Sequence, residues 1–438
     1  MSRRLSLPWA LLVPVVAACA GSARSDIAPP GTGFATAESL YADLRNLRDR
    51  IDVSLASGST TTRDGSLVTL IRNHNRLRTH VSARLSGIDS VGLAATDARA
   101  LGIMQRTLAR DLDSLSVLRL SRSTDSRMPE CRYDPATVAV GRNGLDSLRE
   151  RMYRCFAWAQ SHVVVGPDTL ERLTVLSTLG QTADGRRRRE LFLALDPVWR
   201  SVNADNGPSS PYRQLIAAEM RAHTGARLPS LSQAAASGLE PDSLEGWLTA
   251  LLRAWRRGAQ DSLLEPWDWY YENGSLSRTL GSLVSRERLF EINAEFYRSL
   301  GADVRQLGIH YDTEPREGKT PVAFTTFGAR PRLLGGRWHP GEPWIFATYR
   351  TGGLDNLNEL LHETGHAVHI AAIRTRPAFA DWPDSDPFTE AVADFMALEV
   401  YEPSWQQRWL GNSVPLAVGL HARYAGIVLD VAWALFEL

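Results

Sequence analysis

The sequence predicts a mainly α-helical protein with one small β-sheet beside a helix that carries clustered histidines. From residue 36 onward, apolar residues recur at intervals of three and four, the period of an amphipathic helix. Two segments, Val322–Pro331 and Trp344–Arg350, are instead rich in β-branched and aromatic residues and predict strands. Between them, Gly335–Pro343 is rich in Gly and Pro and predicts a loop. Helical periodicity returns at Leu354.

The same pattern places individual helices and loops. The first apolar face is formed by Leu40, Leu44, Leu47 and Ile51. Comparable helical faces cover Leu67–Leu85 and Ala98–Leu118. Residues that favour turns gather at Ser57–Gly65, Ser121–Pro135 and Asn203–Pro211, where we expect loops.

The composition limits the classes of function. Of the 438 residues, 44% are hydrophobic, so the chain can bury a substantial core. Its 49 basic and 49 acidic residues balance to a formal net charge of zero, which argues against a nucleic-acid-binding protein. One charge run, Arg186–Arg189, precedes Glu190 and an apolar stripe. We expect it to be the solvated start of a helix rather than an anion site.

The first 35 residues predict export and attachment to a membrane. Two arginines precede the apolar stretch Leu5–Ala18, which is too short to span a bilayer but suits a signal peptide over residues 1–18. Cys19 follows Val-Ala-Ala, which resembles the lipobox at which bacterial lipoproteins are cleaved and lipidated. We expect Cys19 to carry the lipid and residues 19–35 to be a flexible tether. The protein would then face the periplasm or the cell exterior. An ordinary cleaved signal with an incidental cysteine is the alternative.

Two further cysteines, Cys131 and Cys155, remain in the exported part of the chain. An oxidising compartment and an even count favour a disulfide between them. Their spacing resembles no zinc-binding motif.

A metal-binding motif, H-E-x-x-H, begins at His362. The surrounding apolar residues predict a helix that Asp355 caps and that ends before Pro377. On this helix His366 shares a face with the first histidine, about 5–6 Å away, so both imidazoles can reach one zinc ion. Glu363 lies one residue further round, where its carboxylate can act as a base on a water molecule at the ion.

A catalytic zinc needs a third protein ligand and one open position, and the next predicted helix offers the ligand. Thr389 can cap this helix, which runs to about Tyr401. Glu390, in its first turn, is the expected third ligand. Asp394 shares the face of Glu390 and can accept a hydrogen bond from a ligand histidine. We therefore expect one Zn²⁺ per chain, bound by the two motif histidines and Glu390.

Other assignments of these residues stay open. His369, one turn beyond the motif, could be the third ligand, although one helix face rarely encloses an ion on three sides. Otherwise we expect His369 to support the metal site or to face substrate. The motif histidines could also be a surface pair, with Glu390 an acidic residue favoured by the helix dipole. The ligand types alone do not exclude another divalent metal.

The segment Leu361–Leu398, which contains HETGHAVH and FTEAVADFMAL, resembles the active-site region of gluzincin metallopeptidases. Two related families share these features, the thimet oligopeptidase family and the angiotensin-converting enzyme family. Pro315–Lys319 (PREGK) and Pro266–Asp268 resemble elements of the first family. The gap between the second histidine and the third ligand is closer to that of the second family. The resemblance covers about residues 260–438.

The resemblance implies an elongated, helical, zincin-type fold with a deep channel, zinc on the channel floor and Glu363 as the general base. It implies that the strand at residues 322–331 lines the channel, so that Phe324 and Thr325 contact the substrate. It also implies that the substrates are short peptides, cleaved by an oligopeptidase or by a dipeptidyl carboxypeptidase (peptidyl-dipeptidase).

The chain departs from these families at its C-terminal end. In the families, Tyr and His residues well downstream of the third ligand stabilise the oxyanion. Here the chain ends at Leu438, 48 residues after Glu390 (438 minus 390), so we expect that downstream part to be missing. Tyr424, and also His421, are the nearest substitutes.

These observations predict an N-terminal helical region at residues 36–260 and a catalytic region at residues 261–438. The favoured function is a zinc metallopeptidase that acts on short peptides. A non-catalytic or incomplete zinc-binding lipoprotein of the same fold is the alternative, and a binding module with a fortuitous motif is a third reading. The sequence predicts no oligomeric state.

Overall fold

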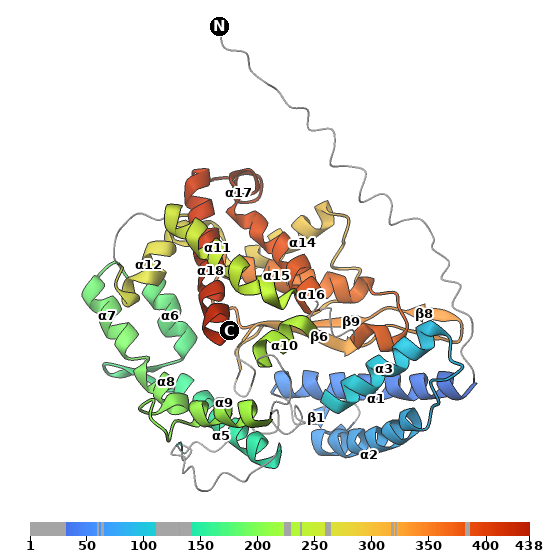
Figure 1. Cartoon of the computed structure of the whole chain (residues 1–438). Helices are drawn as coiled ribbons and strands as arrows, with labels where there is room; N and C mark the ends of the chain where they lie inside the picture. Colours follow the sequence, from blue (N-terminus) through green and yellow to red (C-terminus); the bar gives the residue numbers. More distant parts are fainter. Residues whose placement is uncertain are drawn as a thin grey trace.

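A computed structural model of the chain describes residues 32–58, 61–62, 65–110, 131, 142–222, 229–236, 239–258, 264–316, 319, 322–381 and 386–438. The expected signal peptide and Cys19 lie outside these residues. The described chain is mainly helical with a few small sheets, as the sequence predicts (Figure 1).

The first helices form a layer beneath the main sheet (Figure 1). The elements are α1 (Thr32–Ala56), β1 (Thr61–Thr62), β2 (Gly65–Ser66), α2 (Leu67–Ser86) and α3 (Ala95–Arg110). The expected apolar face of α1 is confirmed, because Leu44 and Ile51 are fully buried in two neighbouring clusters, against which Leu40 and Leu47 pack respectively. The expected tether boundary at residue 35 is wrong, because α1 begins at Thr32. Phe34 is buried in the core around α1, α2 and α3, which explains the earlier start.

The next part of the chain is drawn in green to yellow-green (Figure 1). It comprises α5 (Arg142–Gln160), β3 (Val163–Val165), β4 (Asp168–Leu170), α6 (Arg172–Gln181), α7 (Gly185–Leu193), α8 (Asp196–Asn203), α9 (Pro211–Ala222), α10 (Pro229–Ala236) and α11 (Pro241–Gly258). Cys131 and Cys155 are joined by a disulfide. The Arg186–Arg189 run does start a helix, but it is not wholly solvated. Arg188 is buried and forms an ion pair with Asp268.

The remaining elements surround the histidine motif. They are η3 (Pro266–Asp268), α12 (Trp269–Asn273), α13 (Ser275–Leu280), η4 (Gly281–Leu283), α14 (Arg286–Ser299), β5 (His310–Asp312), β6 (Phe324–Ala329), β7 (Arg332–Leu334), β8 (Arg337–His339), β9 (Glu342–Phe346), α15 (Leu354–Ala372), η5 (Pro377–Asp381), α16 (Asp386–Ala397), η7 (Leu398–Tyr401), α17 (Pro403–Leu410) and α18 (Leu416–Glu437). The largest buried cluster of the described residues joins α13, α14, α15 and α17.

The main sheet has the order β5-β9-β6, with β5 parallel and β6 antiparallel to β9. The two predicted strands, β6 and β9, pair as expected. The third strand, β5, was not predicted from its three residues. The predicted loop at Gly335–Pro343 contains part of a hairpin, β7 and β8, whose turn is Gly335-Gly336. Both glycines have positive φ values, 57° and 76°, which glycine adopts without strain and which a tight hairpin turn requires.

Helix α1 packs along β6, and two arginines tie it to the sheet and to η5. Arg330, directly after β6, donates through Nε to Asp49 at 2.8 Å, and both side chains are buried. Arg376, just before η5, pairs with Glu38 and Asp97 at 2.7 Å each. Because these partners lie about 280 or more residues apart in the chain, the N-terminal helices and the motif region form one packed body.

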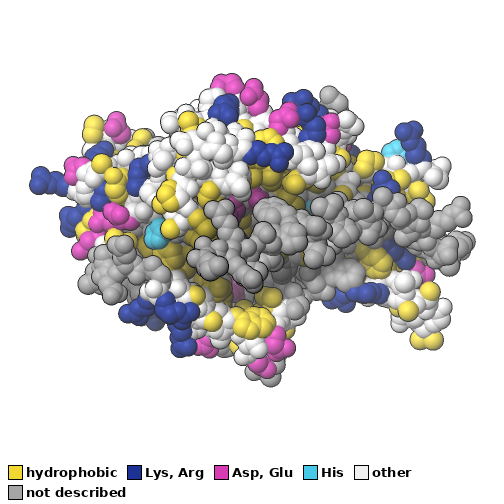
Figure 2. All heavy atoms as spheres, turned by 90° about the horizontal axis from the view of Figure 1, so that it is seen from above, with side chains coloured by type: hydrophobic (Ala, Val, Ile, Leu, Met, Phe, Trp, Pro, Cys, Tyr) yellow, Lys and Arg dark blue, Asp and Glu magenta, His cyan; other side chains and the backbone are white. Residues whose placement is uncertain are grey.

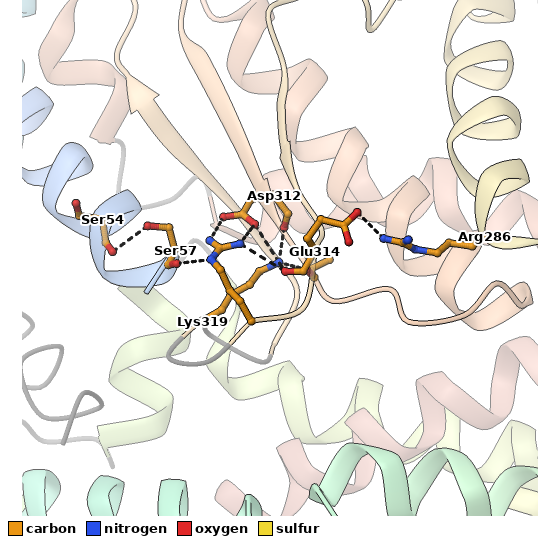
Figure 3. A network of polar contacts seen from close by, with 8 residues as sticks. Ser54, Ser57, Arg286, Asp312, Glu314 and Lys319 are labelled. Atoms are coloured by element: carbon orange, nitrogen blue, oxygen red, sulfur yellow. Dashed lines mark hydrogen bonds and ion pairs between the residues drawn. The ribbon is translucent and has the colours of Figure 1, made fainter. Parts of the chain in front are cut away.

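A second polar network closes the other end of the sheet (Figure 3). Lys319 is buried, and its Nζ donates to the carbonyls of Asp312 and Ala347 and pairs with the Asp312 carboxylate at 3.1 Å. Arg316 binds the same carboxylate and donates through Nε to the carbonyl of Ser57 at 2.8 Å. The segment that resembles PREGK therefore joins β5 to β9 and to the C-terminal end of α1.

Basic and acidic side chains are interspersed over the described part of the face shown in Figure 2. Within the described residues, the helices lack the length and hydropathy needed to span a bilayer.

Candidate metal centre

Helix α15 carries the H-E-x-x-H motif and is fixed by its buried face. Leu357, Leu360 and Leu361 are fully buried in the largest core cluster. The helix begins at Leu354, and the residue before it is Gly353, whose φ of 114° suits glycine. The expected cap at Asp355 is therefore wrong. Asp355 lies in the first turn, where its carboxylate accepts a hydrogen bond from Ser277.

Helix α16 supplies the acidic side chains. It begins at Asp386, three residues before the expected cap Thr389, because Pro387 suits the first turn of a helix. Glu390 consequently lies in the second turn rather than the first. The helical segment ends at Tyr401 as expected, although its last four residues form the 3₁₀ helix η7.

The two helices meet so closely that three donor atoms converge. The Nε2 atoms of His362 and His366 lie 3.1 Å apart. The Oε2 atom of Glu390 lies 3.4 Å from each of these nitrogens. The ligand atoms of these three side chains all lie within 4.8 Å of one another, close enough to hold one metal ion. Within the described part of the chain, they form the one such group of His, Cys, Asp and Glu side chains.

This triangle fits a tetrahedral zinc ion. An ion that binds nitrogen and oxygen at about 2.0–2.2 Å separates neighbouring ligand atoms by roughly 3.3–3.6 Å. The three observed distances, 3.1, 3.4 and 3.4 Å, are close to this range. Two imidazole nitrogens and one carboxylate oxygen are also the donor set of catalytic zinc sites that leave one position open.

Asp394 determines which ring nitrogen of His362 faces the triangle. Its Oδ1 lies 2.9 Å from Nδ1 of His362. An ionised carboxylate can only accept, so Nδ1 carries the proton and Nε2 presents a lone pair toward Glu390 and His366. Burial opposes a charged ring, but the hydrogen bond to Asp394 and the nearby carboxylates raise the pKa of His362. For His366, burial prevails and lowers the pKa.

Glu363 contacts the sheet, and its carboxylate also interacts electrostatically with His362 and Glu390. Its Oε2 accepts a hydrogen bond from Oγ1 of Thr325 at 2.7 Å, and its backbone oxygen lies 2.9 Å from the same hydroxyl. Burial raises the pKa of Glu363, and the Thr325 hydrogen bond partly offsets this rise. Thr325 was predicted as a substrate contact, which stays a prediction; the structure shows that its hydroxyl is bonded to the predicted base.

The other predicted site residues lie in different surroundings. The ring of Phe324 stacks on Phe346 with centroids 5.1 Å apart, on the face of the sheet opposite Thr325. His369 is outside the group of three donors, and its ring packs edge-on against Phe388 of α16. Tyr424 is exposed on α18, and His421 packs against Trp255 of α11. The structure thus assembles His362, His366, Glu390 and Asp394 and places the remaining candidates outside the donor group.

The sequence analysis did not identify Tyr297, a residue of α14 that forms a hydrogen bond with the backbone of α15. Its hydroxyl donates to the carbonyl of Leu361, directly before the motif, at 2.5 Å. Tyr297 is buried on α14, and burial raises the pKa of its hydroxyl. It follows the pattern of an apolar helix face, so its sequence position predicts a core residue.

No protein-family model matches the chain, and a search of curated proteins finds no match either.

Proposed function

We propose that the protein is a zinc-dependent peptidase that hydrolyses short peptides. The observation that supports this most directly is the triangle of donor atoms from His362, His366 and Glu390, with sides of 3.1 to 3.4 Å. The carboxylate of Glu363 adjoins it. The resemblance of residues 361–398 to gluzincin metallopeptidases supports the same function. By that resemblance we also propose a zincin-type fold with a substrate channel above α15.

The residues present suit zinc, and its role in such sites is to polarise a water molecule and the scissile carbonyl. His362, His366 and Glu390 would hold the ion, and Asp394 would keep the His362 ring in the required tautomer. The chain contributes no thiolate to this group of donors.

Glu363 carries the proton transfers. Its Oε2 is occupied by the Thr325 hydroxyl, so Oε1 is the oxygen that takes a proton from the attacking water. The water oxygen bonds to the carbonyl carbon, the carbon–nitrogen bond breaks, and Glu363 passes the proton to the leaving amine. The carboxylate is buried and has a raised pKa, which suits a group that must bind and release a proton.

The alternative is a zinc-binding protein without catalysis. A structural ion needs no base beside it. Here the carboxylate of Glu363 lies outside the donor group, accepts a hydrogen bond from Thr325 and interacts electrostatically with His362 and Glu390. This arrangement favours catalysis. We also propose that the chain is exported and anchored through a lipidated Cys19, on the strength of its N-terminal sequence.

Two variants test the proposal. Zinc-loaded protein without residues 1–19 is incubated with a library of quenched fluorescent peptides, and zinc is measured in parallel. We expect Glu363→Gln to keep zinc and to lose turnover by a factor of at least about 100. We expect Glu390→Ala to lose zinc. Equal cleavage by the parent and Glu363→Gln would refute the role of Glu363, and full zinc binding by Glu390→Ala would refute ligation.

A further inference from the structure

Thr325 of β6 donates a hydrogen bond to the carboxylate of Glu363 on α15. The contact depends on the register of the sheet. In β6, successive side chains point to opposite faces. Phe324 stacks on its cross-strand partner Phe346, and Thr326 lies opposite Trp344, whose ring stacks on Phe346. Thr325 must therefore point to the other face, which α15 covers.

The hydroxyl of Thr325 lies between two acceptors of the same residue. It is 2.7 Å from Oε2 of Glu363 and 2.9 Å from the backbone oxygen of Glu363. A hydroxyl has one proton, and an ionised carboxylate is the stronger acceptor, so the bond to Oε2 dominates. This bond restrains the last torsion of the Glu363 side chain, which is otherwise broad.

We infer that Thr325 is a positioning residue, which holds Oε2 of Glu363 so that Oε1 faces the reacting water. The inference rests on the proposed peptidase function and adds a residue to its machinery. It differs from the role that the family resemblance implies for this strand, where Thr325 would contact the substrate. A substrate contact would chiefly affect KM, whereas the position of the base affects kcat.

The chain offers a conservative variant and a matched control. Thr325→Val removes the hydroxyl and keeps the shape of the side chain. Thr325→Ser keeps the hydroxyl. Thr326→Val makes the same chemical change one residue on, on the opposite face of β6. Because both threonines are half-buried in one strand, a general effect on the strand would appear in both valine variants.

The experiment measures kcat and KM of the zinc-loaded parent and of these three variants on a peptide that the parent cleaves. We expect Thr325→Val to lower kcat by about tenfold or more, with KM within about twofold of the parent. Thr325→Ser should keep kcat within about threefold, and Thr326→Val should match the parent.

A second readout needs no catalysis. In metal-free protein, the melting temperatures of Thr325→Val, Glu363→Ala and the double variant form a thermodynamic cycle. If the hydrogen bond exists, Thr325→Val lowers the melting temperature of the parent more than that of Glu363→Ala. Equal shifts in both backgrounds would overturn the inference.

The outcomes separate this inference from the proposed function. A raised KM with unchanged kcat in Thr325→Val would make Thr325 a substrate contact and overturn positioning. Equal kcat in Thr325→Val and the parent would do the same. Cleavage of no peptide by the parent would overturn the proposed function itself, and the inference would fall with it.

Discussion

Gly365 of α15 faces Ala393 of α16 so closely that a Cβ atom on Gly365 would lie 2.8 Å from the Cα atom of Ala393. The same atom would lie 3.1 Å from the hydroxyl of Tyr297. Gly365 lies between the motif histidines, and Ala393 lies between Glu390 and Asp394. The small side chains at this crossing therefore determine how near the carboxylates of α16 come to the imidazoles of α15.

We expect Gly365→Ala to push the helices apart and to weaken zinc binding by at least about tenfold, since ligand geometry is lost over a few tenths of an ångström. Overpacking of this kind also costs about 1–3 kcal/mol of unfolding free energy. Gly246→Ala in α11 is the control, because a Cβ there meets nothing within 4 Å. Zinc titration and urea unfolding give both quantities. Parent-like zinc affinity in Gly365→Ala would contradict the role of the close crossing.

Asp394→Ala should lower zinc affinity by about 10–100-fold without removing a ligand. The variant loses the acceptor for Nδ1 of His362, so the ring can rotate or change tautomer. Competition against a chromophoric chelator measures the affinity. Glu390→Ala sets the scale, because loss of a ligand should weaken binding more. Identical affinities for Asp394→Ala and the parent would show that the hydrogen bond does not prepare the site.

Two arginines that bind α1 should differ sharply in their contribution to stability. Arg330 and Asp49 are both buried, so Arg330→Met leaves an uncompensated charge and should cost about 3–5 kcal/mol. Arg332 pairs with Asp43 at 3.0 Å, but the side chains are 34% and 53% exposed. Arg332→Ala should therefore cost only about 0–1 kcal/mol. Urea unfolding of both variants measures their free energies of unfolding. Equal decreases in the two variants would contradict the prediction that the buried ion pair contributes more to stability than the exposed one.

Asp312 should contribute to stability in a pH-dependent way. Burial works to raise the pKa of its carboxyl, but hydrogen bonds and charges from Arg316 and Lys319 together lower it (Figure 3). The unfolded chain, with an ordinary aspartate pKa of about 3.9, then takes up this proton before the folded protein does. The stabilisation is present above about pH 4 and is lost as the pH falls through the folded pKa. Between about pH 5 and pH 3, the unfolding free energy should therefore fall less in Asp312→Asn than in the parent. If the unfolding free energies of the parent and Asp312→Asn fell in parallel with pH, Asp312 would not contribute to the pH dependence of stability.

The sequence predicted those parts of the site that lie within one helical turn. His362 and His366 share a face because residues four apart do so on any helix, and Glu390 and Asp394 follow the same rule on α16. The pairing of β6 with β9 was predictable for a similar reason, since β-branched and aromatic residues favour strands wherever they lie. Helix starts were less predictable. Asp355 and Thr389 can both cap a helix, but Gly353 and Pro387 allowed the chain to enter each helix earlier.

The sequence by itself determined the helical character of the chain, the donor residues and their order, because these follow from local periodicity and side-chain chemistry. The tertiary structure alone decided that Thr325 contacts Glu363, that Arg188 is buried against Asp268, and that Gly365 meets Ala393. Each of these contacts joins residues 28 to 80 positions apart, by the differences of their numbers. Such contacts depend on the register of a sheet or on the crossing of two helices. Register and crossing are set by how whole faces pack, which no short window of sequence contains.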